Sequence, residues 1–300
     1  MADTYGPIEA VHKTTYQANV ELAIQQKLPK LLPHTSPIND LKGKEMQAVE
    51  LVGSSEAQED APHSTDTPDI PPRHLGIYVK PRRIIWGRSI PSETSIKAAV
   101  DYQSTYVQEG AAAVVRSRDK FLSEAAFGPR YIKYEEDGIP VSVAFDTTNR
   151  QIAVNYGAGS DTGLTVKKIV RGLTLLEAAE VDIDSEELIL WHSAAQNESL
   201  YAELQVTSKD YRDKAVFEDK RVREFMGIKL VSYQKLPVAS SVRTCLLYCK
   251  SGLHSGDAMP VTTQIERNVA KQYQPHPFME TWLGSTRSED EKFVQILAKE

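Results

Sequence analysis

Apolar residues recur at helical spacing in two segments of the chain, residues 92–127 and 165–180. We expect the first helix to end at Gly128-Pro129, because glycine and proline commonly terminate helices. We expect the second helix to begin after Thr165, whose hydroxyl can cap the first turn. The first helix is long enough to act as a strut, and its apolar face consists of Val107, Ala111, Val114, Val115, Leu122 and Ala125.

Apolar and polar residues alternate in much of the remaining chain, which is typical of half-buried strands. Residues 45–52 and 75–90 form two such segments around a polar stretch that contains four prolines. They predict a β-hairpin with an oversized tip, and loops longer than about 15 residues are usually functional or disordered. Shorter strand patterns occur near residues 141–145, 152–156, 188–192, 201–206, 228–233, 243–250, 261–269, 278–283 and 293–297.

The predicted hairpin has its charges separated along the chain. Its tip, residues 53–74, contains five acidic residues and one arginine, whereas the return strand contains four basic residues and no acid. Such a loop is either a solvated flap or an element that docks on a neighbouring subunit by charge complementarity. For docking, the candidate contact residues are the acidic Glu56, Glu59, Asp60, Asp66 and Asp69 and the basic Arg82, Arg83, Arg116, Arg118 and Lys120.

Composition narrows the class of protein. The chain has 300 residues, of which 41% are hydrophobic and 25% charged, as in an ordinary soluble globular protein. No apolar run reaches the roughly 18 residues that a membrane-spanning helix needs. The formal net charge of −6 argues against a dedicated nucleic-acid-binding protein, but not against one that encloses nucleic acid. Two cysteines are too few for a disulfide framework, which favours synthesis in a reducing compartment.

A glycine-rich stretch offers a candidate cofactor site. Gly157, Gly159 and Gly163 follow a predicted strand and precede a predicted helix, as a dinucleotide-binding fingerprint does. The third glycine comes one residue late, and no second strand ends in an acidic residue at the right distance. A glycine-rich turn before a capped helix explains the same residues. A nucleotide-dependent oxidoreductase that uses these glycines is therefore the alternative from another class.

Other reactive residues do not combine into a catalytic or metal site. Cys245 and Cys249 would face the same side of a strand, and with His254 alone they do not complete a structural zinc site. His192 and Ser193 are adjacent, but the chain has no nucleophile elbow of the G-x-S-x-G type. The acids around Asp182 are more typical of a solvated loop than of a cation site. We therefore predict no catalytic residues, no cofactor and no metal.

The order of the segments resembles the major capsid proteins of tailed bacteriophages over essentially the whole chain. An arm precedes the long hairpin, a strut helix follows, and a mixed segment with one amphipathic helix leads into a β-rich end. None of the most similar stretches is a catalytic signature. These stretches are Tyr78–Arg83, Tyr106–Asp119, Gly163–Thr165, Ser208–Tyr211 and Phe225–Ile228.

The resemblance implies an α+β protein with the tailed-phage capsid fold, and a structural role in place of enzymatic activity. The protein would assemble into hexamers and pentamers of an icosahedral shell that encloses double-stranded DNA without sequence-specific binding. The implied regions are an N-arm (1–44), an extended loop over the adjacent subunit (45–91), a peripheral domain with a spine helix (92–161), an axial domain (162–249) and C-terminal strands of the peripheral domain (250–300).

Two departures from the wider family shape the expected partners. Some relatives crosslink a loop lysine to an asparagine of a neighbour, but no lysine lies between Glu45 and Val79 here, so we do not expect this crosslink. Others begin with a long scaffolding segment, which we do not find, so we expect a separate scaffolding protein. Portal and decoration proteins are further expected partners. The expected location is the virion, after synthesis in the cytoplasm of the bacterial host. An encapsulin-like compartment shell is the alternative on the same fold.

Overall fold

The computed structural model divides into two compact units. Unit 1 consists of Met1–Pro29, Arg82–Lys120 and Asp257–Leu283, and unit 2 consists of Lys30–Pro81, Phe121–Gly256 and Gly284–Glu300. The residues that the structure describes are 25–39, 41–43, 45–54, 72, 74–90, 102–134, 139–203 and 223–300.

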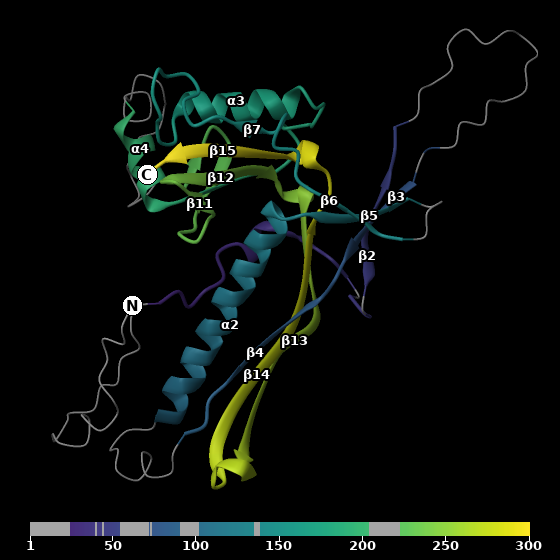
Figure 1. Ribbon diagram of the computed structural model, residues 1–300, viewed down its shortest axis with the longest axis vertical. Helices are drawn as coiled ribbons and strands as arrows, with labels where there is room; N and C mark the ends of the chain where they lie inside the picture. The colour runs from purple at the N-terminus through teal and green to yellow at the C-terminus, as the bar shows by residue number, and fades with distance from the viewer. Residues whose placement is uncertain are drawn as a thin grey trace, which may run out of the picture. The chain divides into compact units, whose positions relative to one another are not determined.

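Unit 1 combines one helix with a β-ribbon (Figure 1). The helix is α2 (Tyr102–Phe127), whose last turns belong to unit 2. The ribbon has the strand order β13-β14-β4. Phe278 of β14 lies opposite Gly87 of β4 in an antiparallel pair. The ribbon strands are β4 (Arg82–Gly87), β13 (Leu253–Asn268) and β14 (Gln274–Arg287).

A glycine permits the contact between α2 and β4. Gly110 is buried within α2, where glycine is otherwise unfavourable. A Cβ atom at this position would lie only 2.4 Å from Cε3 of Trp86. Gly110 therefore lets the indole ring of Trp86 lie directly against the helix backbone. Next to it, Arg88 lies 4.3 Å above the ring centre of Tyr106.

Unit 2 is built around a mixed sheet in the order β7-β15-β12-β8-β10-β9, with β11 paired to β12. Strand β12 is antiparallel to both of its neighbours, whereas β8 and β10 are parallel, as are β7 and β15. The strands are β7 (Gln151–Ile152), β8 (Leu188–His192), β9 (Glu224–Phe225), β10 (Ile228–Ser232), β11 (Val238–Ala239), β12 (Val242–Cys249) and β15 (Phe293–Lys299).

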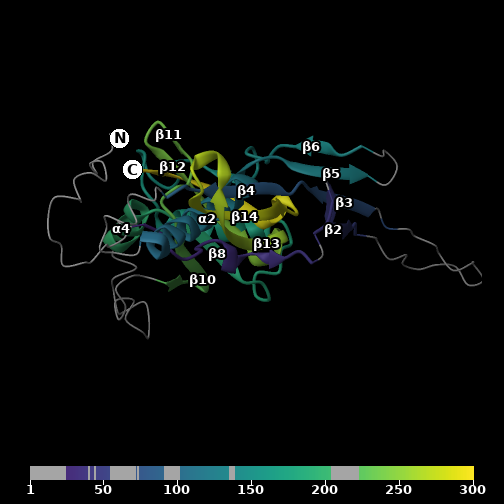
Figure 2. The ribbon, with the colours of Figure 1, turned by 90° about the horizontal axis from the view of Figure 1, so that it is seen from below.

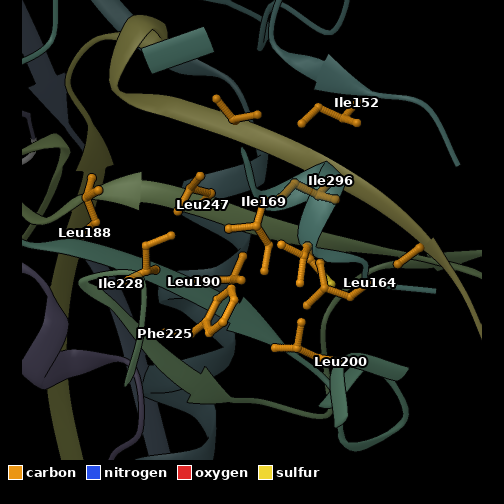
Figure 3. Packing of buried hydrophobic residues seen from close by; sticks show 14 of the residues in the cluster. Ile152, Leu164, Ile169, Leu188, Leu190, Leu200, Phe225, Ile228, Leu247 and Ile296 are labelled. Atoms are coloured by element: carbon orange, nitrogen blue, oxygen red, sulfur yellow. The ribbon is translucent and has the colours of Figure 1, made fainter. Parts of the chain in front are cut away.

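The amphipathic helix α3 (Val166–Glu177) supplies its apolar face to the core of unit 2. Figure 3 shows Ile169 of α3 close to Leu247 and Ile296 of the sheet. Burial of this face supplies most of the helix's stability, because a helix of this length is marginal by itself. The shorter helix α4 (Ala194–Ala202) adds Leu200 to the same cluster.

A third sheet, also in unit 2, has the order β2-β3-β5-β6 (Figure 2). Its central strands pair antiparallel, with Ile77 opposite both Val49 and Ile132. The short strand β1 (Ser36–Pro37) pairs in parallel with the start of β13. The strands of the third sheet are β2 (Met46–Val52), β3 (His74–Val79), β5 (Arg130–Tyr134) and β6 (Val141–Val143).

Most predicted elements are confirmed. The strut helix ends at Phe127, directly before Gly128-Pro129, while residues 92–101 of the predicted helix lie outside the described part of the chain. Thr165 caps α3, and its side chain accepts a hydrogen bond from the backbone N–H of Lys168. The hairpin pairs as β2 and β3. The α+β class is also confirmed.

Three predicted elements are wrong in detail. The single return strand at 75–90 is two strands, because the chain leaves the hairpin sheet at Lys80-Pro81 and joins β14 as β4. Residues 154–157 form turns after a two-residue strand, with Gly157 at a φ of +75°. Tyr201 lies in α4 and not in a strand. Ser193 caps this helix, which has no clear apolar stripe to reveal it in the sequence.

Candidate assembly surfaces

The base of the predicted N-arm is part of unit 2. Leu31 and Leu41 are buried there. The hydroxyl of Tyr248 donates to the carbonyl oxygen of His34 at 2.9 Å, and the hydroxyls of Thr35 and Ser255 lie 2.6 Å apart. This segment is therefore anchored on its own chain. Residues 1–24, which complete the predicted arm, lie outside the described part of the chain.

Among the predicted basic contact residues, Arg83 already has a carboxylate partner in its own chain. Its Nε and Nη2 atoms donate to the two carboxylate oxygens of Glu280 at 2.6 and 2.9 Å. The indole N–H of Trp282 adds a third hydrogen bond to Glu280 at 2.8 Å. The hydrogen bonds from these donors lower the pKa of Glu280, and those from Arg83 have the largest effect. The pair bridges the neighbouring strands β4 and β14.

The two arginines predicted on the spine helix are also engaged within the chain. Arg118 is largely buried, and its Nη2 donates to Asp257 at 2.6 Å. Arg116 donates to the side-chain oxygen of Gln25. Arg82 and Lys120 are exposed. The acidic candidates Glu56, Glu59, Asp60, Asp66 and Asp69 all lie outside the described residues.

The glycine-rich stretch surrounds a buried lysine and not a vacant phosphate site. The ammonium of Lys168 donates to the carbonyl oxygens of Val154, Thr162, Gly163 and Leu297 at 2.8, 2.8, 2.9 and 3.0 Å. At the start of α3, the backbone N–H of Val166 donates to the carboxylate of Glu203 at 2.8 Å. The chain's own charges thus occupy the positions that a dinucleotide phosphate would need. The carbonyl cage joins the loop to the C-terminal strand β15.

The remaining candidate residues are either buried or paired within the chain. Cys245 and Cys249 are free and buried, and burial raises the pKa of each thiol to about 12. The hydroxyl of Ser193 donates to Glu300 at 2.6 Å. Glu187 accepts hydrogen bonds from Lys229 and Lys250, which lower its pKa. Among the described residues, no group of three or more side chains has the arrangement of a metal site.

A family model described as phage capsid protein matches residues 8–300. The chain belongs to this family. It is a structural capsid protein, and copies of it associate into the capsomers of a shell. In the described part of the chain, no helix combines the length and the apolar character that crossing a membrane requires.

Solved structures agree with the capsid fold. A chain of Mycobacterium phage Che8 superposes with a TM-score of 0.70 at 13% identity, covering 95% of this chain and 96% of that chain. The capsid of Ralstonia phage GP4 gives 0.69 at 13% identity, covering 96% and 95%. The capsid of cyanophage Pam1 gives 0.68 at 12% identity, covering 100% and 99%. No curated protein sequence matches the chain.

The oxidoreductase alternative is not supported for this capsid protein. Its sheet has the antiparallel strand β12 at its centre, whereas dinucleotide-binding folds build a mostly parallel sheet. The helix start that would hold a phosphate is occupied by Glu203. The sequence did not reveal the carbonyl cage around Lys168, because no pattern in it predicts that Leu297 lies next to the glycine-rich loop. The amphipathic pattern of α3 was the one available signal, since it places Lys168 beside the buried Ile169.

Two histidines of the capsid protein lie at the anchored base of the arm. Burial lowers the pKa of His34, and Lys229 and Lys250 lower it further against the opposing charge of Glu187. His34 Nδ1 is buried without a hydrogen-bond partner in the described structure.

Burial also lowers the pKa of His254, which lies opposite Ser36 in the β1–β13 pair, and Lys292 adds to this effect. Protonating either ring therefore places a new positive charge beside existing lysines.

We expect acid to loosen the base of the arm. Because folding lowers both histidine pKa values, the unfolded chain binds more protons below about pH 6.5, and folding stability falls as the pH falls through this range. Thermal unfolding at pH 7.5 and pH 5.5 tests this. The wild type should lose more stability at pH 5.5 than the double variant His34→Gln/His254→Gln. An equal loss in both proteins would contradict the prediction.

Proposed function

We propose that this capsid protein assembles into hexamers and pentamers of an icosahedral shell that encloses double-stranded phage DNA. The observation that carries the proposal is the family match over residues 8–300. The fold, shared across nearly the full length of phage capsid chains, supports it. The acidic net charge fits DNA that is confined and not bound sequence-specifically.

In this proposal the predicted regions keep their roles in the shell. Residues 92–161 and 250–300 form the peripheral domain, and residues 162–249 form the axial domain that meets its copies at capsomer centres. Each contact between copies can be weak, because a closed shell repeats the same contact many times and the sum stabilises the assembly. We propose a separate scaffolding protein, a portal and decoration proteins as partners. Synthesis takes place in the host cytoplasm.

The assembly state of the purified chain tests the proposal. Light scattering on a sizing column, with negative-stain microscopy of the same fractions, should reveal closed shells, sheets or tubes of hexamers. The scaffolding protein from the same phage should be co-expressed in a parallel sample. A chain that stays monomeric in both samples and performs catalysis would refute the proposal.

The extended loop is proposed to dock on a neighbouring copy through its acidic tip. Arg83 and Arg118 already hold carboxylates of their own chain, Glu280 and Asp257, which counts against these two arginines as the residues that receive the tip.

Reversing two charges of the loop tip should weaken assembly. We expect the variant Glu59→Lys/Asp60→Lys to need about tenfold more protein for half-maximal shell formation, which corresponds to roughly 1.4 kcal/mol per contact. Turbidity or light scattering against protein concentration measures the shift.

The control is Glu224→Lys, because Glu224 is exposed and lies in a different hairpin, formed by β9 and β10. The variant Glu266→Lys/Asp257→Lys is not a suitable control, because Asp257 pairs with Arg118. Unchanged assembly of Glu59→Lys/Asp60→Lys would count against loop docking.

A further inference from the structure

A polar hollow lies on one face of the hairpin sheet. It has a volume of about 180 Å³, and three strands of unit 2 contribute to it. This volume accommodates a single side chain but not a folded partner. Its lining residues are Gln47 and Glu50 of β2, His74, Gly76 and Tyr78 of β3, and Lys133 of β5.

The floor of the hollow is a glycine that the backbone does not require. Gly76 lies in the middle of a central strand, paired with Glu50 on one side and Lys133 on the other. Its φ is not positive, and the irregularity of this sheet lies in β2, between Gln47 and Val49. Glycine weakens a strand interior, and there it often marks the close approach of a ligand or another chain.

The absence of a side chain at Gly76 keeps the hollow open. A Cβ atom here would lie 3.0 Å from the ring of Tyr78 and 3.3 Å from the amide carbon of Gln47. Any larger side chain would therefore project into the space between these two residues. Glycine at this position thus lowers the stability of the strand but leaves the hollow open.

The hydrogen-bond donors at the hollow can hold an anionic guest. Glu50, the carboxylate among the lining residues, already shares a hydrogen bond of 2.8 Å with the ring of His74. The ammonium of Lys133 lies 5.9 Å from the ring centre of Tyr78, and within the described residues no carboxylate lies within ion-pair distance of it. The Tyr78 hydroxyl is only 3.5 Å from Gln47, a long hydrogen bond. The ammonium, the phenol and the Gln47 amide are thus donors that a carboxylate can use.

We propose that this hollow receives a carboxylate side chain from the acidic loop tip, residues 56–69, of a second copy of the chain. The inference rests on the proposed shell assembly, because it requires neighbouring copies. That segment contains five acids and no lysine or arginine, whereas Arg83 and Arg118 are already neutralised within the chain. Lys133 then supplies the charge that fixes the loop of the neighbour.

Disulfide trapping tests the contact directly. Lys133→Cys is combined in turn with Glu56→Cys, Glu59→Cys, Asp60→Cys, Asp66→Cys or Asp69→Cys, and assembled shells are oxidised mildly. The native cysteines do not interfere, because both are buried and burial raises their thiol pKa values to about 12. At least one pair should give covalent oligomers on a non-reducing gel. Lys271→Cys, an exposed lysine of unit 1, replaces Lys133→Cys in the matched control and should give none.

Two substitutions test the energetics. Lys133→Glu should raise the protein concentration needed for assembly by about tenfold, and adding Glu59→Lys/Asp60→Lys should restore it. Gly76→Ala should impair assembly by more than any change in the melting temperature of the subunit accounts for. The higher strand preference of alanine is opposed by the close contact of its Cβ with the Tyr78 ring, 3.0 Å away. A glycine needed only for folding would instead give a lower melting temperature, with normal assembly of the subunits that remain folded.

The outcomes separate this inference from the proposed function. Shells that form at normal yield but give no crosslink, or only crosslinks within one chain, overturn the inference and leave the shell function intact. A wild-type chain that forms no shell, even with its scaffolding protein, overturns both.

Discussion

Replacing Gly110 with alanine is expected to destabilise unit 1 by about 2 kcal/mol. The added methyl group would lie 2.4 to 2.9 Å from three carbon atoms of the Trp86 ring, far inside van der Waals contact. Overpacking of this kind typically costs about 1–3 kcal/mol, and more where the neighbours cannot move. Alanine gains about 1 kcal/mol of helix propensity over glycine, which offsets only part of this cost. Urea unfolding followed by tryptophan fluorescence measures the difference.

A second substitution shows whether the ring is the cause. Trp86→Leu removes the indole and leaves space beside the helix, so Gly110→Ala should cost less, or even stabilise, in that background. A double-mutant cycle gives the coupling energy, which should exceed about 1 kcal/mol. Gly159→Ala is the matched control, because no atom lies within 4 Å of a Cβ there. Additive effects of Gly110→Ala and Trp86→Leu would disprove the contact.

Replacing Lys168 with methionine is expected to destabilise unit 2 by about 3 kcal/mol. Methionine fills most of the space of the lysine stem but donates no hydrogen bond, so four carbonyl oxygens lose a donor. Val154 and Thr162 retain other donors, the backbone N–H groups of Thr162 and Lys299 respectively. The cost therefore arises mainly at Gly163 and Leu297, and a buried unsatisfied polar group costs about 1–3 kcal/mol.

The adjacent lysine provides a matched control. Lys167→Met makes the same chemical change at an exposed side chain whose contact with Gly157 is 3.5 Å long. It should change the unfolding free energy by less than about 0.5 kcal/mol. Comparable losses in the two variants would show that the carbonyl cage is not what holds the loop.

The pH dependence gives a second signature of the buried ammonium. Burial lowers the pKa of Lys168 to about 8, below its usual 10.5. Between these values the unfolded chain binds more protons than the folded chain, so this lysine makes folding stability rise as the pH increases from about 8. The difference in stability between wild type and Lys168→Met should therefore grow in favour of the wild type over this range.

The sequence predicted local elements better than their partners. The amphipathic pattern of α3 and the Thr165 cap are local features, and they appear at the expected residues. In α2 the expected face is only partly right, because Val114 and Leu122 are buried but Ala111 is exposed. The strand pattern at 75–90 was correct in type, but alternation does not reveal that the chain changes sheets at Pro81. That change depends on residues such as Glu280, which lies far along the chain and pairs with Ile85 and Arg83.

The candidate contact residues show the same limit. Arg83 and Arg118 were identified by charge, but charge alone does not tell an intermolecular arginine from one paired within the chain. Lys133 was overlooked because it stands alone in the sequence, and the hollow beside it is made by strands that are distant in the chain. Whether the acidic tip meets it stays a prediction.

The way the chain alternates between the two units has a consequence for how the protein folds. Ile85 of β4 pairs with Glu280 of β14, so the β4–β14 ribbon of unit 1 cannot form until residue 280 has been synthesised and has left the ribosome. Contacts between such distant residues slow folding, and they leave unpaired strand edges exposed in the meantime. High-level synthesis of this chain should therefore depend on chaperones, and truncation after residue 256 should give aggregates in place of a folded fragment.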